Sequence, residues 1–371
     1  MHMAPAASPS PRPGVGPWAV AGTYVGTVIG AGFASGQEIL QFFGFFGWRG
    51  LAGILLSTFL LAWFGVRILL LGHRLRAPSY RTVLHRVAGP LGGRLIDGLI
   101  AFFLFGGAAT MAAGAGAVFE EQFGWPAEAG RGLMVAAAAL TVLLGLRGVV
   151  RAVSLVVPGL LGAVVGLGAW SAATGKLRWE WSQPEAAAVP WWPLSAVVYA
   201  SYNLVLAIAV LAPLGRAADE ASLRRGGWWG GLGLGAGCVA ILASLLAHLP
   251  ETARVEVPMV VVAGALSPLV QTAYGAVLLA EIYTTAVAGL YGVIVRFAGE
   301  EEPRFGWLVL GAALLAWTLS RFGFSTLVAR LYSLVGYGGI LLLAALWRAG
   351  DGKGAAGGQR GGGGKGAGPG A

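Results

Sequence analysis

The sequence TVIGAGFASGQEILQFF, residues 27–43, lies within an apolar segment long enough to cross a membrane. Gly30, Gly32 and Gly36 fall within seven positions, and Gln37 and Glu38 follow directly. Glycine is among the weakest helix formers and a carboxylate is costly in hydrocarbon, so a helix that only crosses lipid needs neither. The stretch therefore predicts an interrupted helix with a functional site at the interruption.

The composition indicates an integral membrane protein. The 371 residues are 57% hydrophobic and 11% charged, whereas soluble domains carry about a quarter charged residues. The apolar runs are continuous rather than alternating, which predicts an all-α protein and not a barrel. The net charge of +9 would suit nucleic acid in a soluble protein, but here the basic residues sort by membrane side. We therefore expect a lipid bilayer around the chain and no nucleic-acid partner.

Apolar runs, separated by arginine, proline or polar clusters, predict about ten transmembrane helices. Basic residues are concentrated in every second loop, which predicts that those loops and both termini are cytoplasmic. The spans are 17–46, 48–72, 92–119, 130–147, 150–173, 193–214, 227–249, 267–297, 305–321 and 324–348. The apolar stretch 255–266 is too short to span and is expected to form an outer loop helix.

The predicted organisation is one transporter-like domain between two tails. Residues 1–16 form a disordered N-terminal tail, and the glycine-rich residues 349–371 form a disordered C-terminal tail. The ten-helix domain, 17–348, divides into repeat one, 17–173, and repeat two, 193–348. A single cysteine, Cys238, excludes an internal disulfide.

Two spans carry polar or helix-breaking residues near their middle. The first contains Gly30 to Phe33, and the sixth contains Tyr199-Ala200-Ser201-Tyr202-Asn203. Interrupted spans at corresponding positions of two halves indicate the binding site of a transporter. Taken alone, the spacing of Gly22, Gly26 and Gly30 is better explained by close helix packing. Close packing is also preferred for the glycine run 231–237, which has no preceding strand to make it a nucleotide-binding loop.

The stretch GTVIGAGFASGQEI, residues 26–39, resembles the first-helix signature of the YkvI-like bacterial membrane proteins. These form a branch of the amino acid–polyamine–organocation superfamily. The resemblance covers residues 17–348, although only this stretch is specific. It implies the LeuT fold, a 5+5 inverted repeat with broken helices 1 and 6, in the bacterial plasma membrane.

The resemblance also implies a sodium site between helices one and eight. Its ligands would be the carbonyls of Gly26, Ile29 and Glu281 and the hydroxyls of Thr284 and Thr285. Backbone and hydroxyl oxygens suit a group I cation, and side chains three and four residues apart share a helical face. A second sodium is not expected, because a phenylalanine, residue 33, stands where many sodium-coupled carriers have Asn or Asp.

A proton is the alternative coupling ion. Helix five, 149–174, lacks the lysine that replaces sodium in proton-coupled relatives. Glu281 is nevertheless a possible proton carrier, because a buried carboxyl group favours its protonated form.

The substrate site is expected at the two interruptions. The predicted contacts are the backbone of the first-span segment and polar or aromatic side chains of the sixth span, where a ring could hold an ammonium or simply pack. The residues are Gly30, Ala31, Gly32, Phe33, Ala34, Tyr199, Ser201, Tyr202 and Asn203.

Glu38 and Arg330 are expected to form a charged outer gate over this site, because spans one and ten supply such a gate in LeuT-like carriers. A static buried pair, or an arginine that reaches outward to the interface, remains an alternative.

These residues predict a secondary transporter that moves a small amino acid or organic amine by alternating access with sodium. The alternatives are a ligand sensor with a transporter fold, or a carrier coupled to protons. An enzyme is not expected, because His73, His85 and His248 lie near span ends and complete no nucleophile–base pair. No cofactor other than the coupling ion is expected, and the sequence does not specify an oligomeric state.

Overall fold

The computed structural model describes residues 15–144 and 157–350, and every regular element within these ranges is a helix. Six elements in this part of the chain are long and apolar enough to cross a membrane, which confirms a membrane protein. They are α4 (Trp48–Arg74), α5 (Tyr80–Phe123), α9 (Trp192–Leu214), α10 (Glu220–Ala247), α12 (Pro268–Ile294) and the run Phe324–Ala349.

Shorter helices complete the described bundle. They are α6 (Ala127–Leu143), α8 (Val157–Thr174), α11 (Pro258–Leu266), α13 (Phe305–Ser320) and the 3₁₀ turns η2 (Pro184–Ala186) and η3 (Glu251–Ala253). Helix α11 matches the predicted outer loop helix. Helix α5 begins well before the predicted third span because it continues through a kink at Gly89, where φ is +69°. Most of the two predicted tails, the end of the predicted fourth span and the start of the predicted fifth span lie outside the described residues.

The first span is broken, as predicted. It consists of α1 (Pro17–Val28), α2 (Ala31–Ala34), α3 (Gln37–Phe42) and the 3₁₀ turn η1 (Gly44–Phe46). Ile29 and Gly30 are extended, with ψ of 116° and −172°. No backbone hydrogen bond joins the N–H groups of 30–33 to the carbonyls of 26–29. A second interruption separates α2 from α3. There Gly36 has φ of +83°, a left-handed conformation that glycine adopts without strain.

The predicted break in the sixth span is wrong, because α9 is continuous from Trp192 to Leu214. Its polar side chains bond to the helix itself: the Ser201 hydroxyl donates to the Val198 carbonyl, and Asn203 Nδ2 donates to the Tyr199 carbonyl. The predicted break segment also contains neither glycine nor proline to disrupt the helix.

An irregularity that we did not predict lies in the last span. Here α14 (Phe324–Leu327) leads into a π-helical segment, η4 (Val328–Tyr332), and then into α15 (Ser333–Gly350). Such π-helical turns occur frequently at functional sites.

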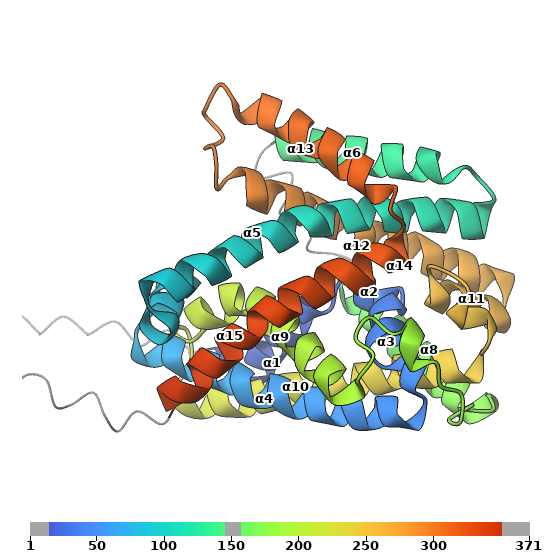
Figure 1. The fold of residues 1–371 in the computed structure, drawn as a ribbon, viewed down its shortest axis with the longest axis horizontal. Coiled ribbons are helices and arrows are strands. Elements are labelled where there is room, and N and C mark those ends of the chain that lie inside the picture. Colours follow the sequence, from blue (N-terminus) through green and yellow to red (C-terminus); the bar gives the residue numbers. More distant parts are fainter. Residues whose placement is uncertain (1–14, 145–156, 351–371) are drawn as a thin grey trace, which may run out of the picture.

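The helices form two packed groups with the broken span between them (Figure 1). Helices α5, α6, α12 and α13 pack together on one side, and α4, α9 and α10 pack on the other. The first span bridges the groups, because α1 packs on α10 and α9 whereas α2 contacts α12. The break at Ile29–Gly30 is therefore enclosed by protein.

Both ends of the described chain lie at the same end of the bundle. The Val15 amide donates to the Ala217 carbonyl at 3.0 Å, which places the start of α1 beside the turn between α9 and α10. Arg67 near the end of α4 donates to the Leu346 carbonyl near the end of α15, at 3.1 Å.

Close helix packing accounts for the glycine run of α10, as expected. A Cβ added at Gly231 would lie 2.6 Å from Ala62 Cα of α4, a distance that real Cβ contacts do not show. A Cβ added at Gly233, two residues away, would meet only Val25 Cγ2 at 3.4 Å, an ordinary contact.

Gly231→Ala should therefore lower the apparent Tm of the purified protein, because overpacking of this kind costs about 1–3 kcal/mol. Gly233→Ala on the same helix is the matched control and should leave the Tm unchanged or slightly raised. A thermal-unfolding assay in detergent compares the two variants, and equal effects would contradict the packing assignment.

Candidate substrate and ion site

A cavity of about 240 Å³ lies at the break of the first span. Its walls come from the first span, α5, α9, α12 and the π-helical segment. The lining residues are Gly26, Thr27, Val28, Ile29, Gly30, Ala31, Gly32, Glu38, Phe103, Met111, Tyr202, Asn203, Leu206, Glu281, Thr284, Thr285, Ala288 and Tyr332. The unpaired backbone groups of the break and two buried carboxyl groups thus face one space.

Glu38 is held in this cavity by two contacts. The Tyr202 hydroxyl of α9 donates to Glu38 Oε2 at 2.6 Å. The carboxyl group also lies against the backbone of Gly32, where an added Cβ would overlap Glu38 Oε1 and lie 3.0 Å from Cδ. The side chain is only 6% exposed. Gly32 therefore gives the carboxyl group room that any other residue would fill.

The predicted gate between Glu38 and Arg330 is wrong for this structure. Arg330 is exposed and lines a separate hollow with Ala188 and Ser333, whereas Glu38 bonds to Tyr202. Tyr332, two residues further along the same π-helical segment, lines the cavity instead.

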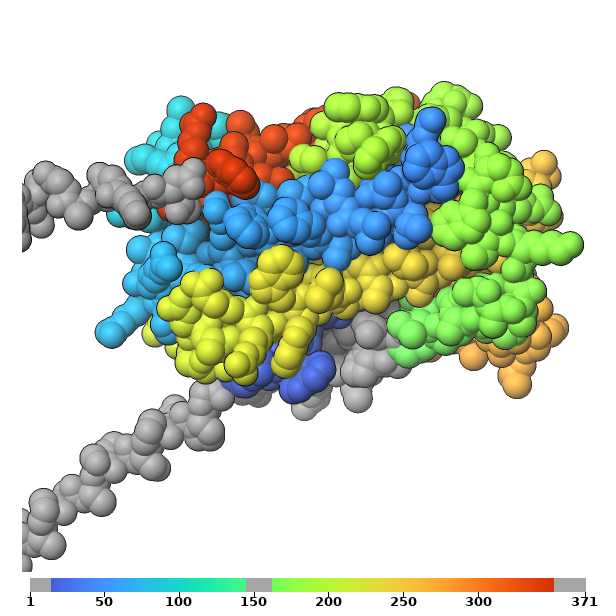
Figure 2. All heavy atoms as spheres, turned by 90° about the horizontal axis from the view of Figure 1, so that it is seen from below, coloured from blue at the N-terminus to red at the C-terminus, as the bar shows by residue number. Residues whose placement is uncertain are grey.

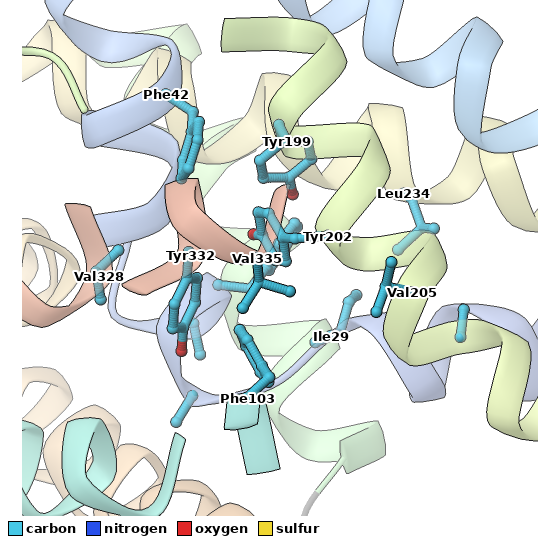
Figure 3. Packing of buried hydrophobic residues seen from close by; sticks show 14 of the residues in the cluster. Ile29, Phe42, Phe103, Tyr199, Tyr202, Val205, Leu234, Val328, Tyr332 and Val335 are labelled. Atoms are coloured by element: carbon cyan, nitrogen blue, oxygen red, sulfur yellow. The ribbon is translucent and has the colours of Figure 1, made fainter. Parts of the chain in front are cut away.

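Aromatic rings pack around Tyr202, the partner of Glu38 (Figure 3 shows the rings). The Phe103 and Tyr202 rings are stacked with centroids 6.1 Å apart, and Tyr332 lies 4.8 Å from Phe103 and 5.2 Å from Tyr202. On α3, the Phe42 ring lies 5.7 Å from Tyr202. We did not predict Phe103, Met111 or Tyr332, because an apolar residue of a span carries no signal that separates lining from packing.

Four predicted substrate contacts lie outside the cavity. The Phe33 ring packs toward Gly237 of α10, and the Tyr199 hydroxyl lies 3.5 Å from Cys238 Sγ. The Ser201 hydroxyl, which bonds to the Val198 carbonyl of its own helix, also lies within hydrogen-bond distance of the Gly336 carbonyl, and the Ala34 carbonyl accepts from a tyrosine of α12. These groups tie the first and sixth spans to their neighbours. The other five, Gly30, Ala31, Gly32, Tyr202 and Asn203, line the cavity.

All five predicted sodium ligands line this same cavity. The Thr284 hydroxyl donates to the Glu281 carbonyl at 3.0 Å, and Thr285 Oγ1 lies 3.9 Å from a Cβ position built on Gly30. The Glu281 side chain is 3% exposed, and its Oε2 has no hydrogen-bond partner in the described structure. Backbone carbonyl and hydroxyl oxygens are the ligand type that a hard cation prefers.

Helix α11 covers the turn between α2 and α3. The Met259 amide donates to the Ser35 carbonyl at 3.0 Å. Just before α11, Glu256 accepts from the Phe324 amide at 2.7 Å, and its own amide donates to Glu121 at 2.6 Å. This outer segment thus connects the first span, the last span and α5.

Two sequence relatives cover nearly the whole domain, although no family model matches the chain. The uncharacterized membrane protein YkvI of Bacillus subtilis (strain 168) is 31% identical over 329 residues, which span 87% of this chain and 93% of YkvI. The chain belongs to the YkvI family. The uncharacterized protein YyaD of the same organism is 30% identical over 344 residues, with the same shares of both chains.

Solved structures identify the fold of this YkvI-family chain. MhsT in complex with L-phenylalanine superposes with a TM-score of 0.59 at 16% identity and covers 87% of both chains. The manganese transporter of Eremococcus coleocola (H236A variant) gives 0.54 at 18% identity and covers 89% of this chain and 76% of its own. These likenesses show the LeuT fold, as predicted, and the relatives and structural neighbours are not enzymes.

The hydrogen bond between Tyr202 and Glu38 should appear as a coupling in a double-mutant cycle. Because a hydrogen bond to a charged group contributes about 1.5–3 kcal/mol, Tyr202→Phe and Glu38→Gln should be clearly non-additive. The measurement is the apparent Tm of each single and double variant. Tyr24→Phe is the control partner, because its hydroxyl bonds to the Leu61 carbonyl instead. Additive effects for the Tyr202 pair would contradict the contact.

Proposed function

We propose that this protein is a secondary transporter of a small organic amine or amino acid, driven by sodium and working by alternating access. The observation that carries the proposal is the broken first span, whose unpaired backbone groups face a cavity with two buried carboxyl groups. Backbone left unpaired at membrane depth is tolerated only where it lines a cavity or is buried in protein.

The charge of the cavity favours a substrate that carries an amine. Glu38 and Glu281 line it, and its described lining includes no lysine, arginine or histidine. A protonated amine would be attracted by the carboxylates and by the ring faces of Tyr202, Phe103 and Tyr332. The volume, about 240 Å³, is below the range of sites for drug-sized ligands and suits a small molecule.

The two structural neighbours with the same fold differ in what they bind. MhsT was crystallised with L-phenylalanine, which agrees with an amino acid or amine, whereas the second structure is a manganese transporter. Within the described residues, no group of three or more His, Cys, Asp or Glu side chains gathers as a metal site. The donor chemistry of this chain therefore favours the organic substrate.

Sodium is the proposed coupling ion, held by the Gly26, Ile29 and Glu281 carbonyls and the Thr284 and Thr285 hydroxyls. A proton on Glu281 is the second candidate, and the unpartnered Oε2 atom favours it. We place the protein in the bacterial plasma membrane with both termini cytoplasmic. The end of the bundle that holds both ends of the described chain, and with them Arg67, Arg74 and Arg224, would then face the cytoplasm, as the excess of basic residues on that side requires.

Uptake into proteoliposomes tests the proposed activity directly. An inward sodium gradient should drive accumulation of at least one radiolabelled small amine or amino acid, and an equal choline gradient should not. Glu38→Gln should abolish this uptake, because it removes a charge from the cavity. Ligand binding without accumulation under any sodium or proton gradient would instead indicate a sensor.

The ion site is tested separately by a sodium-dependent thermal shift. Thr284→Ala with Thr285→Ala should lower the apparent sodium affinity by roughly 100-fold, because each hydroxyl contact with a charge is worth about 1.5 kcal/mol. Thr272→Ala is the matched control on α12, where the exposed hydroxyl bonds to the Pro268 carbonyl. An unchanged sodium response in the double variant would overturn the site, and a pH-dependent response lost in Glu281→Gln would favour the proton.

A further inference from the structure

A second pocket lies far from the broken span, at the arginine-rich end of the bundle. It has a volume of about 280 Å³ and lies between α4, α10 and α15. On this face α4 runs between α15 and α10 (Figure 2). Its polar lining consists of Trp63, Arg67, Arg74, Arg224 and Trp228. The transport proposal uses none of these residues.

The pocket is positively charged. Arg74 has no ionic partner in the described part of the chain, whereas Arg224 binds Glu220 at 2.6 Å. Arg67 Nη1 donates to the carbonyls of Leu346 and Trp347, both at 3.1 Å. The pocket therefore has three positively charged guanidinium groups and one neighbouring carboxylate, that of Glu220. A bound anion would neutralise part of the remaining positive charge.

The deep end of the pocket is held by an aromatic ring. The Arg67 guanidinium lies over the Trp63 ring, 5.0 Å from its centroid. Arg67 is thus engaged within the protein, and Arg74 and Arg224 are the arginines of the pocket that can meet an anion.

The surroundings place the pocket at the level of lipid headgroups. Trp18 and Trp229 are in contact at this end, with centroids 4.5 Å apart, and Trp347 is exposed nearby. Tryptophans gather in this way at membrane interfaces. Arg74 is the last residue of α4, and Arg67 lies about 10 Å deeper along the helix by its rise per residue.

The wall of the pocket between these two levels is apolar. It is formed by Val66, Leu70 and Leu71 of α4 together with Leu346 of α15. A charged mouth above an apolar wall matches a phosphate joined to an acyl chain better than it matches a free anion.

We propose that this pocket binds the phosphate of an anionic phospholipid of the phosphatidylglycerol type, taken from the surrounding leaflet. Arg74 and Arg224 attract the phosphate, and the acyl chain follows the apolar wall. A zwitterionic lipid binds less well, because its cationic group meets the same arginines. The lipid joins α4, α10 and α15.

Native mass spectrometry and thermal shift of the full-length protein in detergent test this site. Phosphatidylglycerol should bind and raise the Tm, and phosphatidylcholine and inorganic phosphate should do so far less. Arg74→Gln with Arg224→Gln should weaken phosphatidylglycerol binding about 25-fold, because each basic residue near an anionic surface contributes about five-fold. Arg225→Gln is the matched control, since it removes an exposed arginine of the same helix that does not line the pocket.

Equal binding by the wild type, the double arginine variant and the control would overturn the proposal, and so would equal affinity for phosphatidylcholine. Tight binding of inorganic phosphate would overturn the lipid as the ligand and leave a site for a free anion.

Discussion

The structure depends on one constraint, the unpaired backbone at the break between Ile29 and Gly30. Four N–H groups and four carbonyls lose their helical partners there, and hydrocarbon offers no replacement. The break must therefore lie inside the bundle, and α5, α9 and α12 enclose it. The cavity follows from this enclosure, because the groups that need partners are also the groups available to a ligand.

The sequence predicted the broken first span well because the signal is local. Several glycines and a carboxylate within a short apolar run are costly in a helix that only crosses lipid. The sixth span shows the limit of this reasoning. Its polar residues resembled an interruption, yet serine and asparagine bond to carbonyls of their own helix and leave it intact. The two spans differ in that glycines accompany the polar residues of the first span, whereas the polar segment of the sixth contains neither glycine nor proline.

The candidate site was predicted in part for a similar reason. The five expected ion ligands, whose positions came from the family resemblance, all line the cavity, and on the regular helix α12 the Thr284 hydroxyl bonds to the Glu281 carbonyl. Phe33 and Arg330 instead point elsewhere, because each lies in an irregular segment, beside the break or within η4, where helical spacing no longer gives direction. Glu38 shows the same effect, since the turn at Gly36 brings it beside the break.

The outer segment that carries α11 has a consequence for how opening of the protein could be followed. Its amide at Met259 bonds to Ser35, within the broken span, while Glu256 connects it to Phe324 and Glu121. The part of the first span around Ser35 cannot move away from α11 unless this bond breaks. Amide exchange at Met259 would therefore report how often the two segments separate, without knowledge of any substrate.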